Sequence, residues 1–106
     1  MPSRSGSARV ARLLGQRIKA LRVEAGLTQE EVAWSCDVSK AHLSQIEAGK
    51  GYPSMPVLLA LAKRMGLRPV DIVAYDPADP RTQLLDAIRR DHGDLAAKLL
   101  REIQAR

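Results

Sequence analysis

The chain has 106 residues and a formal net charge of +5, and this length limits it to one domain with at most a small appendage. Aromatic residues make up 3% of the sequence and Phe is absent, so we expect a core of aliphatic side chains and Met, which suits helices. A single cysteine excludes an intramolecular disulfide framework and is ordinary for a cytosolic protein, and no apolar run reaches the roughly 18–20 residues that span a bilayer.

The N-terminal segment holds the whole charge excess. Residues 1–27 carry six basic groups against Glu24 alone, whereas residues 28–75 and 76–106 each contain equal numbers of basic and acidic groups. Clustered Arg and Lys gain by releasing counterions from phosphate, which favours an acidic polymer as partner. The plainer alternative is an arm that is merely solvated. Residues 1–8 lack an apolar pattern and are predicted to form a flexible basic arm.

Residues 28–47, TQEEVAWSCDVSKAHLSQIE, carry the most informative pattern. A first helix is predicted before them, from about Arg9 to Ala25. Thr28 and Glu31 have the capping-box spacing that starts a second helix. Ser39 offers the N-cap of a third helix, whose apolar stripe consists of Ala41, Leu43 and Ile46. Two short helices joined by a tight turn, the second polar on its outer face, predict a DNA-binding helix-turn-helix.

Two further helices complete a predicted domain of residues 9–75. Ser54 is expected to cap the first of them and Gly66 to end it, and Pro69 opens the second. In a tail of residues 76–106, Pro80 is expected to begin one helix and Asp94 to cap another. Two such short helices cannot be stable alone. The tail must therefore cover the domain, pair with a second copy, or bind another protein.

The segment from about Val10 to Ala74 resembles the Cro/repressor-type helix-turn-helix family of bacterial and phage transcriptional regulators. The resemblance runs through LGQRIKALRVEAGLTQ, the helix-turn-helix motif, IEAGKGYPS and LLALAKRMGLRPVDIV in the family's order and spacing. It implies an all-α, five-helix DNA-binding domain, to which this chain adds the C-terminal helical tail.

The resemblance also implies which residues meet DNA. The outer face of the third helix should present Lys40, Ala41, His42, Ser44 and Gln45 after the cap Ser39, and Lys, Gln and Ala suit guanine, adenine and the thymine methyl respectively. Gln29 matches a family position beside phosphate, and Lys50, which follows the third helix, is expected to hold a phosphate. The basic N-terminal segment adds Arg4 in the arm and Arg9 and Arg12 in the first helix. Arg22 and Glu47 match a pair that joins the first helix to the third. A merely solvated helix face is the alternative.

Several residues depart from the family's pattern. Ala48 stands where a polar or basic residue is common, and Asp37 stands where Gly is favoured, although Asp tolerates a left-handed turn. Trp34 occupies a normally polar, exposed position, and it could pack on the tail or a partner, or stack on the DNA backbone. Cys36 is expected to be a small buried hydrophobe. No nucleophile–base pair, phosphate loop or metal spacing is present, so neither an enzyme nor a metal or other cofactor is expected.

The sequence therefore predicts a cytoplasmic, sequence-specific regulator of transcription, in function a repressor, whose partner is double-stranded DNA. One recognition helix touches only about 4–5 base pairs, so two-fold pairing is needed for specificity. We accordingly assign the tail to a homodimer, through the apolar positions Leu84, Leu85, Ile88, Leu95, Leu99 and Ile103. The alternative is an antitoxin whose tail binds a toxin while the helix-turn-helix represses its own promoter.

Overall fold

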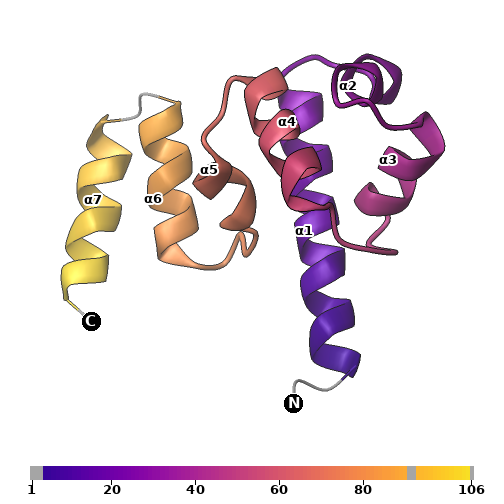
Figure 1. Ribbon diagram of the computed structural model, residues 1–106. Coiled ribbons are helices and arrows are strands. Elements are labelled where there is room, and N and C mark those ends of the chain that lie inside the picture. Colours follow the sequence, from indigo (N-terminus) through magenta and orange to yellow (C-terminus); the bar gives the residue numbers. More distant parts are fainter. Residues whose placement is uncertain (1–3, 91–92, 106) are drawn as a thin grey trace. The chain divides into compact units, whose positions relative to one another are not determined.

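The chain divides into two compact units in the computed structural model, Met1–Tyr75 and Asp76–Arg106. The structure describes the backbone of residues 4–90 and 93–105, and the side chains of residues 8–90 and 97–105. Within these residues the regular elements are all α-helices (Figure 1). The all-α fold predicted from the sequence is therefore confirmed. No helix in the described part is both long and apolar enough to cross a membrane.

The first unit contains α1 to α5, whose bounds are α1 Arg4–Glu24, α2 Gln29–Ser35, α3 Lys40–Glu47, α4 Met55–Met65 and α5 Pro69–Val73. Helix α1 contacts α3 and α5, and α2 contacts α3 and α4. The core consists of aliphatic side chains with one cysteine. Its fully buried members are Ile18, Val32, Leu43, Leu61 and Ile72. Burying such side chains contributes about 1.5–3 kcal/mol each, so this cluster fixes how α1 to α5 pack.

Helix ends in this unit lie at the residues that the sequence singled out. Thr28, Ser39 and Ser54 each accept a hydrogen bond from the backbone N–H three residues on, at the starts of α2, α3 and α4. Gly66, in the left-handed region at φ 68°, ends α4, and Pro69 is the first residue of α5. Because side-chain oxygens satisfy backbone groups that would otherwise lack a partner, these caps set the helix bounds.

The start of α1 differs from the prediction. The helix begins at Arg4, so residues 4–8, predicted to be part of a flexible arm, are helical instead. Once a helix exists, adding a residue costs far less than starting one, and this holds even for Ser5, Gly6 and Ser7, which are weaker helix formers than Arg4 and Ala8. The extension therefore needs no apolar contacts of its own.

The second unit is a pair of helices, α6 Pro80–Arg89 and α7 Gly93–Gln104, which contact each other along their length (Figure 1). Asp79 caps α6 by accepting a hydrogen bond from the Arg81 N–H at 2.8 Å. Helix α7 begins at Gly93, one residue before the predicted cap Asp94.

Candidate nucleic-acid interface

A reciprocal capping box fixes the first turn of α2. The Thr28 hydroxyl accepts a hydrogen bond from the Glu31 N–H, and the Thr28 N–H donates to Glu31 Oε1, both at 3.1 Å. The backbone N–H and then the hydroxyl of Thr28 hold the pKa of Glu31 below its ordinary value. Because the box defines the start of α2, it also fixes the backbone at Gln29 and Glu30, the next two residues.

The turn between α2 and α3 is tight and strained at one residue. Asp37 has φ 56°, in the left-handed region that disfavours most side chains and that Asp tolerates. Ser39 then caps α3, because its hydroxyl accepts from the His42 N–H at 2.9 Å. Gly49, at φ 77°, follows the helix. Helix α3 is thus bounded by Ser39 and Gly49, two residues whose backbone conformations are well defined.

Helix α3 has two clearly different faces. Leu43, Ile46 and Glu47 are buried. The residues predicted to face DNA are exposed, and they are Lys40, Ala41, His42, Ser44 and Gln45. Ala41 was also predicted to belong to the apolar stripe, and this was wrong, since it lies on the outer face. Ser39 is exposed too, but its hydroxyl oxygen already serves as the cap.

Glu47 is the centre of a buried network that joins α1, α2 and α3. Arg22 donates to its carboxylate from Nε at 2.7 Å and from Nη2 at 3.0 Å, and the side chain of Gln29 donates from Nε2 at 3.0 Å. The Arg22 Nη1 donates to the Leu27 carbonyl oxygen at 2.8 Å. The side chains of Arg22 and Glu47 are only 10% and 3% exposed. The pair suggested by the family resemblance is therefore present, and Gln29 braces α2 against the end of α3.

The backbones of α1 and α3 also touch directly. A Cβ placed on Gly15 would overlap the carbonyl oxygen of Ile46 and would lie 2.8 Å from that of Glu47. A Cβ on Gly49 would lie 2.7 Å from the Cα of Arg12. Sequence reasoning missed these approaches, because a glycine inside a helix carries no sign of what lies beside it.

Exposed basic side chains lie on α1 and in the loop after α3. Arg9 and Arg12 on α1 and Lys50 after Gly49 are exposed. Since Gly49 abuts the backbone of Arg12, the helix and the loop place Arg12 and Lys50 at the same end of α3. The Arg4 side chain lies outside the described residues. Arg17 points elsewhere, donating from Nε to the Asp71 carbonyl oxygen at 2.8 Å.

Trp34 in α2 and Cys36 at its C-cap differ in burial. Trp34 is 86% exposed and makes no part of the core, whereas Cys36 is 7% exposed and belongs to it. Burial raises the pKa of the Cys36 thiol. Among the described side chains, no three His, Cys, Asp or Glu residues gather where they could hold a metal ion.

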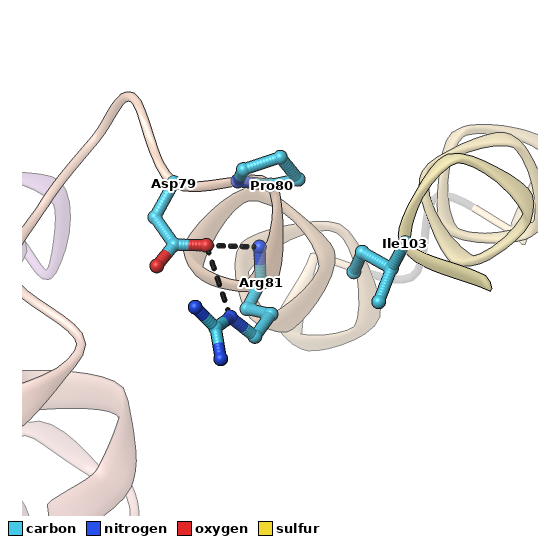
Figure 2. Close-up of a pocket in the computed structure, with 4 residues that line it drawn as sticks. All are labelled: Asp79, Pro80, Arg81 and Ile103. Carbon is cyan, nitrogen blue, oxygen red and sulfur yellow. Dashed lines mark hydrogen bonds and ion pairs between the residues drawn. The ribbon is translucent and has the colours of Figure 1, made fainter. Parts of the chain in front are cut away.

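The tail positions predicted to form a dimer interface differ in exposure. Leu84, Leu85 and Ile103 are half-buried, and Ile88 is 55% exposed. Ile103 reaches toward the first turn of α6, where it lines a cavity of about 270 Å³ with the capping residue Asp79 (Figure 2). Leu99 is 5% exposed, so it is already buried within one chain and is not available to a partner.

The reason for this difference lies in the register of α7. Leu99 falls on the buried side of the helix, whereas Leu100, the next residue, is 45% exposed. The side chain of Leu95 lies outside the described residues. Among the tail side chains that the structure describes, Ile88 and Leu100 are therefore the large apolar groups that are exposed.

Comparison with known proteins gives consistent results. Residues 13–74 match the family described as a helix-turn-helix domain. The chain is 40% identical over 63 residues to an immunity repressor protein of Bacillus phage phi105, covering 59% of this chain and 44% of that protein. It is 39% identical over 69 residues to the uncharacterized HTH-type transcriptional regulator y4dJ of Sinorhizobium fredii, covering 65% of this chain and 90% of the relative. The chain thus spans less than half the length of the phage repressor.

A solved structure resembles part of the chain. The restriction-modification controller protein C.AhdI from Aeromonas hydrophila is similar with a TM-score of 0.55 and 28% identity, over 59% of this chain and 94% of that one.

Proposed function

The chain belongs to the helix-turn-helix domain family, and from that premise we propose that it is a sequence-specific DNA-binding transcriptional regulator, a repressor that binds a two-fold operator as a homodimer. The observation that carries the proposal is the exposed polar face of α3, on a helix fixed by the Glu47 network. A base-reading helix needs both properties, because side chains discriminate bases only from a backbone of fixed position. The proposed place of action is the bacterial cytoplasm, where the DNA lies.

The roles follow from the chemistry of each side chain. Lys40 can donate to guanine O6 and N7, Gln45 can bond adenine bidentately, and the Ala41 methyl can contact a thymine methyl. Lys50 and Arg12, which are exposed near the C-terminal end of α3, would hold phosphate there and fix orientation without reading sequence. Repression would follow from occupancy of the operator, in keeping with the name of the phage relative.

The experiment is a selection of bound duplexes from random DNA, followed by affinity measurements for variants. Gln45→Ala should cost about 1–3 kcal/mol on the selected site and relax preference at one base position in each half-site. Lys63→Ala, on the exposed surface of α4, is the matched control and should leave that preference unchanged. Equal losses for Gln45→Ala on selected and random duplexes would contradict the base-reading role.

We assign dimerisation to the second unit. It has 31 residues, and domains below about 40 residues need a disulfide, a metal or a partner chain to be stable. Its exposed apolar side chains, Ile88 and Leu100, offer a surface for a second copy. Two-fold pairing would also double the length of DNA that is read.

Sedimentation of the Ile88→Asp and Leu100→Asp variants tests this assignment. Each places an unpaired charge in an apolar contact, so each should shift the protein toward monomer while keeping its helical spectrum. Lys98→Asp adds the same group at an exposed position of α7 and should remain dimeric. Variants that stay dimeric but lose a co-purifying toxin would overturn the assignment and support the antitoxin alternative.

A further inference from the structure

An exposed ion pair joins the starts of the two helices of the motif. Lys40 Nζ lies 3.1 Å from Glu30 Oε1, and the two side chains are 59% and 73% exposed. Pairs exposed to this degree contribute little to stability, because water and salt screen the attraction. A stabilising role therefore does not account for the pair, although it involves a residue proposed to read a base.

We propose that Glu30 is a specificity-determining residue, which holds the Lys40 ammonium for a guanine edge and disfavours its use as a phosphate contact. The inference rests on the proposed function, since it requires Lys40 to face the major groove. An ammonium group has three N–H donors. With one donated to Glu30, two remain, which matches the two acceptors O6 and N7 that guanine presents.

The backbone on both sides of the pair is held in place. Glu30 is the second residue of α2, between the two members of the capping box, and Lys40 is the first residue of α3, directly after the Ser39 cap. The Glu47 network holds the same two helices together from the buried side. Both side chains therefore extend from backbone positions that are held in place, and their ion pair limits the positions that the Lys40 ammonium occupies.

The charge of Glu30 explains why bases are preferred over phosphate. A free lysine is a mobile point charge that binds any phosphate oxygen. When Lys40 is paired with Glu30, a phosphate that binds the ammonium lies within a few ångströms of the Glu30 carboxylate, and these two negative groups repel each other. At a guanine edge the carboxylate meets no such charge. Glu30 thus lowers binding to DNA of any sequence more than it lowers binding to the chosen base pair.

Glu30→Gln is the main test, because it keeps the shape of the side chain and removes its charge. Affinity is measured for the duplex that the wild-type protein selects and for duplexes in which one G·C pair of each half-site is changed to A·T. The ratio of these affinities, which is the G·C preference, should fall about five- to tenfold in the variant. Its affinity for a random duplex should rise, and the slope of log affinity against log salt should steepen by up to about one unit per subunit. An unchanged G·C preference would overturn the proposal.

Glu31→Gln is the matched control. Glu31 is an exposed carboxylate in the same turn, and glutamine can replace it in a capping box. This variant should raise affinity for random DNA while keeping the G·C preference, because Glu31 does not contact Lys40. Loss of the preference in Glu31→Gln as well would make the effect one of general charge and overturn the role of Glu30.

A double-mutant cycle shows whether Glu30 acts through Lys40. In a Lys40→Ala background, Glu30→Gln should no longer change the preference at that base pair. A change that persists would mean that Glu30 contacts a base by itself, and the proposal would fail while the proposed function stood. A wild-type protein that selects no sequence at all would overturn both.

Discussion

Removing the carboxylate of Glu47 should be among the most damaging single changes to the first unit. The side chain is 3% exposed and accepts three hydrogen bonds, two from Arg22 and one from Gln29. Glu47→Ala removes two of the three hydrogen bonds that Arg22 donates to the residues described above, and it leaves the guanidinium buried beside the Leu27 carbonyl oxygen. Truncating one partner of a buried pair costs about 3–5 kcal/mol, chiefly because the other charge stays buried and unpaired.

Urea unfolding followed by circular dichroism measures this loss. With a slope of about 1 kcal/mol per molar urea, typical of a small domain, the midpoint should fall by about 3–5 M, or the variant should be unfolded without urea. Glu30→Ala breaks an exposed ion pair and is the control, with an expected loss within about 1 kcal/mol. Similar midpoints for Glu47→Ala and Glu30→Ala would refute the argument. The double variant Arg22→Met with Glu47→Leu should recover most of the loss, because it leaves no buried charge.

Three further predictions concern single residues. Gly15→Ala should lower the free energy of unfolding by about 1–3 kcal/mol, since its Cβ would meet the backbone of α3. Gly51→Ala is the control, because nothing lies within 4 Å of its Cβ, and it should change the free energy of unfolding by no more than about 1 kcal/mol. Thermal unfolding of the two variants measures the difference. Because the Thr28 N–H and hydroxyl lower the pKa of Glu31, the capping box should stabilise the fold above the ordinary Glu pKa of about 4.3 and lose this effect as the pH falls through the lowered pKa. In Thr28→Ala the unfolding midpoint should depend less on pH in this acidic range, and an unchanged pH profile would contradict the stabilising role of the capping box. Burial raises the pKa of Cys36, so a thiol reagent should modify the native protein far more slowly than the urea-unfolded protein, and equal rates would be inconsistent with a buried thiol.

The helix ends could be predicted because each depends on a residue and its immediate neighbours. Thr28, Ser39 and Ser54 cap helices with their own side chains, and Gly66 ends one through its own φ. The extension of α1 to Arg4 could not be found in this way, since it continues an existing helix without an apolar pattern. Helix caps can therefore be predicted from the sequence, whereas the extension of a helix from a neighbouring turn cannot.

The exposed face of the candidate site could be predicted from the sequence, but the ion pairs that hold the site together could not. The exposed polar positions of α3 follow from helical spacing, but the Arg22–Glu47 pair spans 25 residues and came only from the family resemblance. The Glu30–Lys40 pair lies across the turn, ten residues apart, and nothing in the pattern indicates it. In the tail, helical spacing identified the stripe, yet packing against α6 decided which leucine is buried, Leu99, and which is exposed, Leu100.

The close approach of Gly15 to the end of α3 has a consequence for how such proteins diversify. The position of the recognition helix is set by main-chain contact with α1 and by the buried Glu47, neither of which uses the outward side chains. Three exposed side chains therefore do not determine how α3 packs, namely Ala41, Ser44 and Gln45. After a gene duplication, two copies could acquire different operators by exchanging these three residues while keeping the same stability. A library randomised at these positions should yield folded proteins with redirected targets at a high rate, as long as Gly15 is kept.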